Sequence, residues 1–300
     1  MHIPDNFLST PVWATLDAVA VPSIAIFVRR ASHELEENRV PLMGVLGAFV
    51  FAAQMINFPV GVGTSGHLVG GALLACALGP ASAVLVMTAI IALQALVFQD
   101  GGVLALGANI FNMAIAGVLT GYLPLKLWGA GKRRKQAIFA GAFLSVVVSA
   151  SLALSELLIS GVRMPQPVIL ISLGLFVVSA LIEGAITVSV VHALEKLNPM
   201  FIQKPEAPGK SSIAMLGGAA LVVGTAGFLL ASTAPDGLER LGLELGLTAR
   251  TIIHAPLADY ALGSFQAPWL RRAAAGLAGL ILIYGICAAA GRWIGKQRSA

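Results

Sequence analysis

The chain has 300 residues, of which 57% are hydrophobic and 11% charged, and its formal net charge is +5. Soluble domains carry about 25% charged residues, so this composition excludes a soluble globular protein and predicts an integral membrane protein. The basic residues do not indicate nucleic-acid binding, because they lie in short loops between apolar runs and act there as orientation signals. Cys76 and Cys287 lie inside apolar runs, so the sequence offers neither a disulfide framework nor a thiolate metal cluster.

The N-terminus places three nitrogen atoms within a few bonds: the α-amine of Met1, the backbone amide of His2 and the His2 imidazole. Such nitrogens suit late first-row divalent metals, and a planar set favours Ni(II) or Cu(II) over Mg²⁺ or Ca²⁺. We expect Met1 and its amine to remain, because methionine removal generally needs a small second residue. No cationic stretch typical of a cleaved signal precedes the first apolar run. A histidine at this position can also be incidental, so the interpretation needs a partner elsewhere in the chain.

Most of the chain consists of apolar stretches of the roughly 17–25 residues that cross a bilayer. They lie near Val12–Val28, Pro41–Phe58, Pro80–Phe98, Val103–Leu123, Ala137–Gly161, Pro167–Leu194, Ile213–Ser232 and Pro268–Gly291. The segment His67–Leu78 is shorter, and Gly79-Pro80 ends it. If it crosses too, fourteen of the 19 Lys and Arg residues share one side, as the positive-inside tendency requires. We therefore predict an all-α integral membrane protein of about nine transmembrane helices, with the N-terminus outside and the C-terminus in the cytoplasm.

A segment rich in Pro and Gly, residues 198–212, divides the chain on the cytoplasmic side. Residues 1–197 before it form a seven-helix unit. Residues 213–300 after it form a two-helix hairpin with a long external loop, Thr233–Ala267. We expect the hairpin to be an attached accessory unit, because two helices are too few to enclose a site alone.

The external loop Pro59–His67 holds three glycines together with Thr64 and Ser65, and it ends on His67 where apolar sequence begins. The predicted topology puts His67 on the same membrane face as the N-terminus. An interfacial histidine can be a functional group or only a hydrogen-bonded anchor. With the His67 imidazole, the N-terminal nitrogens make a set of four, which matches a square-planar Ni(II) site. Binding through the His2 amide displaces its proton, so affinity should rise with pH.

The opening Met1-His2-Ile3-Pro4-Asp5-Asn6-Phe7-Leu8-Ser9 resembles that of the CbiM/NikM family, the substrate-capture subunits of energy-coupling-factor importers for cobalt and nickel. The similarity extends through Gly63–Leu68, Leu78-Gly79-Pro80, Gln94, Asp100-Gly101-Gly102 and Leu106–Met113, and covers residues 1 to about 125. The resemblance implies that Met1, His2 and His67 bind the metal. The family usually has Gly at Asn6 and often Trp at Ala81; Asn tolerates a left-handed backbone, so we expect the turn to be preserved.

A second resemblance lies in the late external loop, where Pro235-Asp236-Gly237-Leu238-Glu239 is similar to the PDGLE signature of the small accessory subunit of these importers. It implies a fusion of capture and accessory subunits. His254, Asp236 and Glu239 could make a secondary metal contact there, but we favour a solvated loop.

Several polar residues fall within or beside the predicted helices. Asn109 and Asn112 share a helix face, and we expect them, with Thr64 and Ser65, to support the metal site, although the asparagines could instead join helices. Asp17, Glu156 and Glu183 lie within membrane helices, where a proton-coupled carrier would place relay groups.

We predict a substrate-specific subunit, not an enzyme, that takes Ni(II) as its transported substrate from the external side of a bacterial-type cytoplasmic membrane. The resemblance implies a transmembrane coupling subunit and cytoplasmic ATPase subunits as partners, and no bound organic cofactor or nucleic acid is expected. The alternatives are the same role for Co(II), or a self-sufficient proton-coupled metal carrier.

Overall fold

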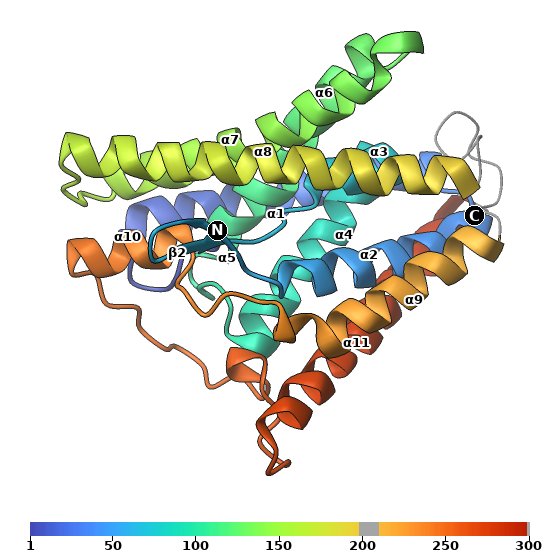
Figure 1. Ribbon diagram of the computed structural model, residues 1–300. Coiled ribbons are helices and arrows are strands. Elements are labelled where there is room, and N and C mark those ends of the chain that lie inside the picture. Colours follow the sequence, from blue (N-terminus) through green and yellow to red (C-terminus); the bar gives the residue numbers. More distant parts are fainter. Residues whose placement is uncertain (198–209, 299–300) are drawn as a thin grey trace.

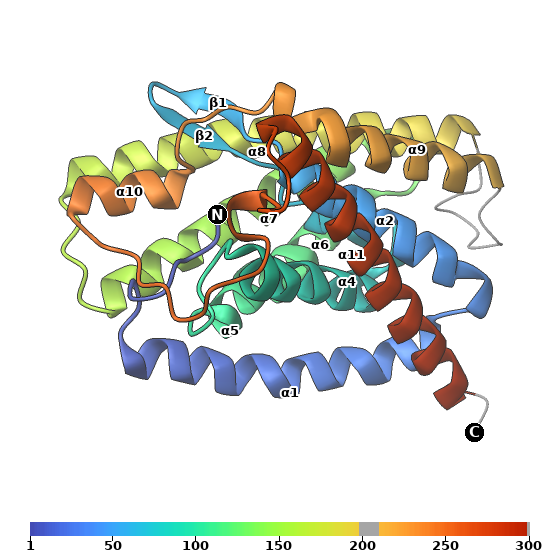
Figure 2. The same ribbon diagram turned by 90° about the horizontal axis from the view of Figure 1, so that it is seen from below.

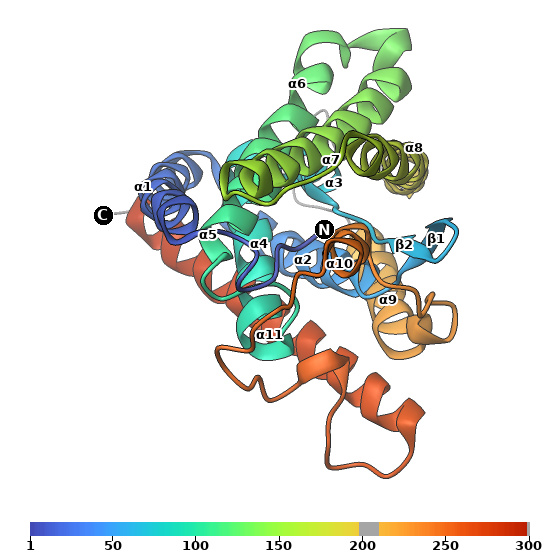
Figure 3. The ribbon, with the colours of Figure 1, turned by 90° about the vertical axis from the view of Figure 1, so that its left-hand side faces the viewer.

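The computed structural model describes residues 1–197 and 210–298. Its long helices form a bundle in which α1 (Thr10–Glu34) and α8 (Gln166–Leu197) lie on opposite sides (Figures 2 and 3). The other helices of the first unit are α2 (Val40–Gln54), α3 (Gly71–Leu78), α4 (Pro80–Leu93), α5 (Leu106–Asn109), α6 (Val118–Trp128) and α7 (Arg134–Ile159). The second unit contributes α9 (Lys210–Ala226), α10 (Gly237–Leu245) and α11 (Pro268–Arg298).

Two of these helices are extended by π-helical turns. Residues Gln94–Phe98 continue α4, and residues Ile110–Gly117 join α5 to α6 in one rod. Within the described residues, seven helices are long and apolar enough to cross a membrane, and the all-helical membrane fold is confirmed. The other two expected crossings, α2 with 15 residues and α3 with 8, are present as shorter helices.

The segment from His67 to Phe98 contains two passes through the bundle. Helix α1 runs about 37 Å away from the N-terminus, so Arg39, in the turn after it, lies at the opposite end of the bundle from the N-terminus. The Arg39 guanidinium donates a 2.7 Å hydrogen bond to the carbonyl of Ala77 at the end of α3. Gly79, with φ +80, then reverses the chain, and Pro80 begins α4. The break predicted at Gly79-Pro80 is therefore where the chain turns back.

The loop after α2 is a β-hairpin, which the sequence analysis did not predict. Strands β1 (Phe58–Gly61) and β2 (Thr64–Gly66) pair antiparallel, with a register shift between Pro59 and Gly61. All of β2 is buried. The hairpin packs on α8, because Gly61 and Gly66 allow close approach to Leu175 and Ser179 of that helix.

The second unit packs against the first along α2 (Figure 1). Helices α9 and α11 flank α2, whose Gly44 and Gly47 leave room for the α11 side chains Tyr284 and Ile283. Helix α10 lies beside the N-terminus and the hairpin (Figure 3). Most of the predicted linker, residues 198–212, is outside the described residues, and α9 begins at Lys210.

Candidate metal site

The N-terminal segment is folded into the bundle. The exposed fractions of Met1, His2 and Ile3 are 8%, 3% and 1%. Asn109 holds Ile3 with two hydrogen bonds: its side-chain oxygen accepts from the Ile3 amide at 2.7 Å, and its amide group donates to the Ile3 carbonyl at 3.0 Å. The carbonyl also accepts from Gly102 at 2.9 Å. These contacts fix the residue that follows His2.

The next residues lock the turn into α1. The Asp5 carboxylate accepts from the backbone amides of Leu104 and Val103, at 2.7 and 2.9 Å. Asn6 has φ +75, so the residue that replaces the family glycine adopts the predicted left-handed turn.

Met1 and His67 meet in the site. The Met1 amine lies 2.5 Å from Nε2 of His67, and Nδ1 of His67 lies 2.9 Å from the Leu68 carbonyl. A carbonyl only accepts, so Nδ1 carries the proton and the lone pair of Nε2 faces the amine. Burial, the positive amine and His2 lower the pKa of His67 to about 4, so its imidazole is neutral at physiological pH. A neutral imidazole nitrogen is a metal ligand.

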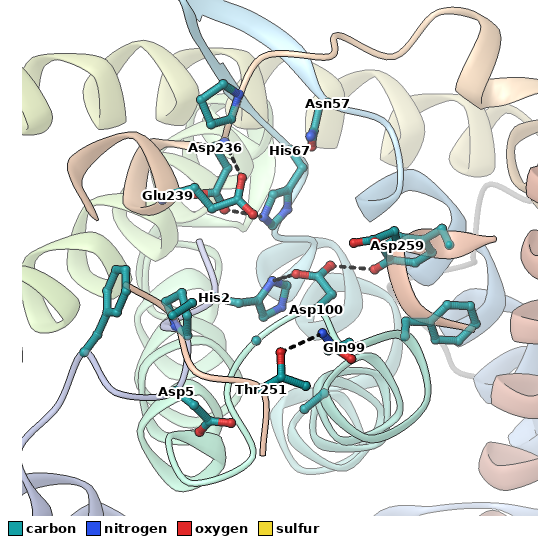
Figure 4. Close-up of a pocket in the computed structure, with 18 of the residues that line it drawn as sticks. His2, Asp5, Asn57, His67, Gln99, Asp100, Asp236, Glu239, Thr251 and Asp259 are labelled. Atoms are coloured by element: carbon teal, nitrogen blue, oxygen red, sulfur yellow. Dashed lines mark hydrogen bonds and ion pairs between the residues drawn. The ribbon is translucent and has the colours of Figure 1, made fainter. Parts of the chain in front are cut away.

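The second histidine lies alongside the first. The rings of His2 and His67 are stacked, with centroids 5.4 Å apart and an interplanar angle of 8° (Figure 4). Nδ1 of His2 is 3.1 Å from Oδ1 of Asp100, yet both ring nitrogens are buried without a hydrogen bond of good geometry. Buried polar atoms are normally paired; Nε2 has no partner and Nδ1 faces only the Asp100 carboxylate, so the ring can accept a ligand.

Within the described residues no group of three or more His, Cys, Asp and Glu side chains is arranged to hold a metal ion. The available donors are instead the terminal amine and the two imidazoles, with the backbone amide between them. A set of nitrogen donors suits Ni(II) better than it suits hard cations such as Mg²⁺ and Ca²⁺, because those cations prefer oxygen ligands.

Asp236 of the C-terminal unit completes the surroundings of the amine. Its Oδ2 lies 2.7 Å from the Met1 nitrogen and 3.9 Å from Nε2 of His67. Asp236 is 8% exposed, so our expectation of a solvated loop is wrong at this residue. Burial raises the pKa of Asp236, but the positive amine, the neighbouring His67 and the hydrogen bonds to the carboxylate together outweigh burial and lower the pKa. His254, by contrast, is exposed.

Asp100 is held by a side chain from the C-terminal unit. The Tyr260 hydroxyl donates to Asp100 Oδ2 at 2.5 Å and accepts from Gln94 at 3.2 Å. Burial opposes ionisation of Asp100, but the facing His2 and Tyr260 hold its pKa well below the ordinary value. Burial and the Asp100 carboxylate raise the pKa of Tyr260. Asp100 is thus an anion next to His2.

A cavity of about 680 Å³ opens beside these groups, between the two units (Figure 4). Carboxylates outnumber arginines in its lining: Asp5, Asp100, Asp236, Glu239 and Asp259, against Arg250. Such a lining attracts cations.

Of the four residues expected to support the site, three lie near it and Asn112 does not. Asn109 contacts the N-terminal segment, and the Ser65 hydroxyl donates to the carbonyls of Ala234 and Pro235, at 2.7 and 3.2 Å, where the PDGLE segment begins. Thr64 is buried in β2. Asn112 instead donates to Glu156 in α7 at 2.9 Å, joining two helices.

Sequence reasoning missed Asp100, Asp236 and Tyr260 as neighbours of the site. The signals available were the Asp100-Gly101-Gly102 run and the PDGLE signature, because both are motifs of the resemblance described above and each contains an aspartate. Nothing in the sequence around Tyr260 points to its contact.

The chain matches known transport proteins over nearly its whole length. Residues 2–201 match the family described as the cobalt uptake substrate-specific transmembrane region, CbiM, and residues 210–296 match the PDGLE domain. A protein of Archaeoglobus fulgidus named as a fused nickel transport protein, NikMN, is 32% identical over 295 residues, which cover 95% of this chain and 96% of that protein.

Two further matches concern mainly the first unit. A protein of Haloquadratum walsbyi named as a metal transport protein is 39% identical over 201 residues, which cover 66% of this chain and 92% of that protein. A crystal structure described as a transition metal transporter matches with a TM-score of 0.59 and 31% identity, over 66% of this chain and 94% of that chain.

Proposed function

The chain belongs to the CbiM family of cobalt uptake substrate-specific transmembrane proteins and carries a PDGLE domain, and from this membership we propose that it captures Ni(II) from the external side of the membrane. The family is one of multi-pass transmembrane components for nickel and cobalt uptake, and it is a transport family, not an enzyme family. The finer proposal names the metal, the ligands and the side from which the metal enters.

The observation that carries the proposal is the convergence of the Met1 amine, His67 and His2 in one buried place. The amine and Nε2 of His67 are 2.5 Å apart, and the His2 ring lies against His67 with its Nε2 unpaired and its Nδ1 facing Asp100. A metal ion entering here would replace the hydrogen bond between the amine and His67 and would meet four nitrogens, with the His2 amide as the fourth. Such a donor set favours square-planar Ni(II).

Nickel is favoured over cobalt by this donor set and by the fused architecture. A relative that matches 95% of the chain, including the PDGLE part, is named as a nickel transport protein, whereas the family takes its name from cobalt uptake. Co(II) remains the alternative substrate.

We further propose that residues 1–197 are the capture unit and residues 213–300 the accessory unit, joined by a cytoplasmic linker at 198–212. In this arrangement the N-terminus is external and the C-terminus cytoplasmic. Family membership implies an energy-coupling-factor importer, so release of the metal would require a transmembrane coupling subunit and cytoplasmic ATPase subunits.

The competing proposal, a proton-coupled carrier, finds little support in the membrane carboxylates. Glu183 accepts from two backbone amides, Glu156 accepts from Asn112, and Asp17 accepts from the Gly107 amide at 2.7 Å. Each is occupied in joining helices or loops.

Calorimetry combined with visible absorption tests the proposal on the purified protein. We expect tight 1:1 Ni(II) binding with a planar low-spin spectrum, which is lost in His67→Ala and in a variant with one extra residue before Met1. His254→Ala is the matched control, because His254 is an exposed histidine of the external loop, and it should bind like the native protein. Equal binding by all four proteins would contradict the proposed ligands.

A further inference from the structure

The two carboxylate oxygens of Asp236 have different partners. Oδ1 accepts from the backbone amides of Leu238 and Glu239, at 2.8 and 2.9 Å, and so caps the N-terminus of α10. Oδ2 takes no part in the cap and lies 2.7 Å from the Met1 amine. The cap therefore orients the carboxylate, and the second oxygen is left facing the N-terminus of the chain.

The backbone around Asp236 is held just as firmly. Its own amide donates to Glu239 at 3.0 Å, which completes a capping box. The preceding Pro235 carbonyl accepts from the Ser65 amide at 2.9 Å, and Ser65 forms a parallel bridge with Asp236. The PDGLE segment thus pairs with β2, two residues before His67, so one short strand fixes both groups that flank the amine.

From this geometry we propose that Asp236 is a positioning residue, through which the C-terminal unit holds the N-terminal amine at the place where the metal binds. The inference rests on the proposed function, since holding the amine matters to capture only if the amine is a ligand. A chain end is otherwise free to rotate, and ordering it on metal binding would cost conformational entropy. A metal-bound amine still has N–H bonds, so Oδ2 remains a suitable acceptor after loading. This is the way in which outer hydrogen-bond partners orient metal ligands.

Asp236 could instead serve only as a helix cap, and one substitution separates the two roles. Asp236→Asn keeps a side-chain oxygen for the cap, because Asn is as good an N-cap as Asp. It presents an NH₂ group, not an acceptor, to the amine. The matched control, Glu239→Ala, removes the other half of the capping box and leaves Oδ2 in place.

The experiment compares Ni(II) affinity by calorimetry in the full chain, in Asp236→Asn, in Glu239→Ala and in His67→Ala, together with amide hydrogen exchange of α10. We expect Asp236→Asn to bind about 10–100-fold more weakly, the usual loss for an outer hydrogen-bond partner, with α10 still protected and the spectrum at saturating nickel unchanged. Glu239→Ala keeps Oδ2 facing the amine but removes one carboxylate from the cavity lining, so it should lose less affinity than Asp236→Asn.

Native affinity in Asp236→Asn would overturn the inference, while the proposed function would stand if His67→Ala still lost binding. If Asp236→Asn loses protection of α10, Asp236→Ser repeats the test, because its hydroxyl also caps a helix. A loss of affinity that always accompanies a loss of protection would show that Asp236 acts as a cap, and this too would overturn the inference. Native affinity in His67→Ala would instead reject the proposed function.

Discussion

The polar groups around the N-terminus differ from those inside the membrane helices. In the site, Nε2 of His2 has no hydrogen-bond partner, and Nε2 of His67 faces the Met1 amine, which also contacts Asp236. In the helices, Glu183 accepts from the amides of Val69 and Gly70 at 2.7 and 2.8 Å and is 1% exposed. A group that must bind a ligand needs free lone pairs, whereas a group that joins segments has them filled. The difference fits the proposed function, in which the first region binds the metal and the second holds the fold together.

Glu183→Ala gives the largest expected effect and tests the structural half of the comparison. It leaves two buried backbone amides without an acceptor, and each such loss costs about 1–3 kcal/mol, or about 2–6 kcal/mol together. We expect a lower free energy of unfolding, which thermal unfolding in detergent would reveal as a lower Tm.

Glu183→Gln is the matched control. It keeps one acceptor oxygen and cannot carry a proton, so it should retain much of the stability and support ATP-driven uptake in the complete importer. Native stability together with abolished uptake in Glu183→Gln would identify a proton relay and would break the comparison.

Asn109 and Asn112 provide a second test within one helical rod. Asn109→Ala removes both side-chain hydrogen bonds to Ile3, so we expect Ni(II) affinity to fall about 10–100-fold. Asn112→Ala removes the bond to Glu156 and should lower Tm with little change in affinity. Calorimetry and thermal unfolding on both variants would decide; equal losses of affinity would show that Asn112 also supports the site.

The pH dependence of binding shows which nitrogens lose protons. Because the pKa of His67 is lowered to about 4, this imidazole is already neutral above about pH 5 and releases no proton there when nickel binds. The His2 amide, in contrast, must lose its proton to bind nickel. Affinity should therefore rise between about pH 6 and 8, by about tenfold per pH unit for each proton released. Calorimetry in buffers of different ionisation enthalpy counts the protons released, and a count of zero would exclude the His2 amide as a ligand.

Much of the fold could be predicted because its signals are local. Helix positions follow from the lengths of the apolar runs, and the reversal in the chain follows from Gly79-Pro80. The distribution of Lys and Arg predicted two crossings within His67–Phe98. The Arg39–Ala77 hydrogen bond agrees with this, because it places the turn between them at the end of the bundle away from the N-terminus. The hairpin was missed because its glycine-rich sequence lacks the alternation of apolar and polar residues that marks a strand.

Only the residues of the site that lie in recognisable sequence motifs were predicted. His2 and His67 have characteristic neighbours in the sequence, and the structure brings them into contact. The burial of Asp236 depends instead on a pairing with Met1 across 235 residues, and an isolated aspartate in a loop is normally solvated. Its role as a helix cap was legible in the capping-box spacing to Glu239, but the direction of its second oxygen was not.

Tyr260→Phe is expected to have the smallest effect. The hydroxyl contacts Asp100, and Asp100 in turn lies next to His2, so the substitution acts on a proposed metal ligand only indirectly. We expect Ni(II) affinity to fall by less than about tenfold, which is the smallest loss typical of a residue that contacts a metal ligand directly. Calorimetry on the full chain measures the change, and the control is Tyr284→Phe, which removes the hydroxyl of a tyrosine that packs on α2 and does not line the cavity.

The size of this effect relative to that of Asp236→Asn tests how the C-terminal unit reaches the site. Asp236 contacts the amine directly, whereas Tyr260 acts only through Asp100. If contact with a metal ligand determines the effect, Asp236→Asn must weaken binding more than Tyr260→Phe. The reverse order would mean that the C-terminal unit contributes mainly by holding Asp100, the anion next to His2, and not by holding the amine. Asp100 would then be the more important partner of the proposed ligands.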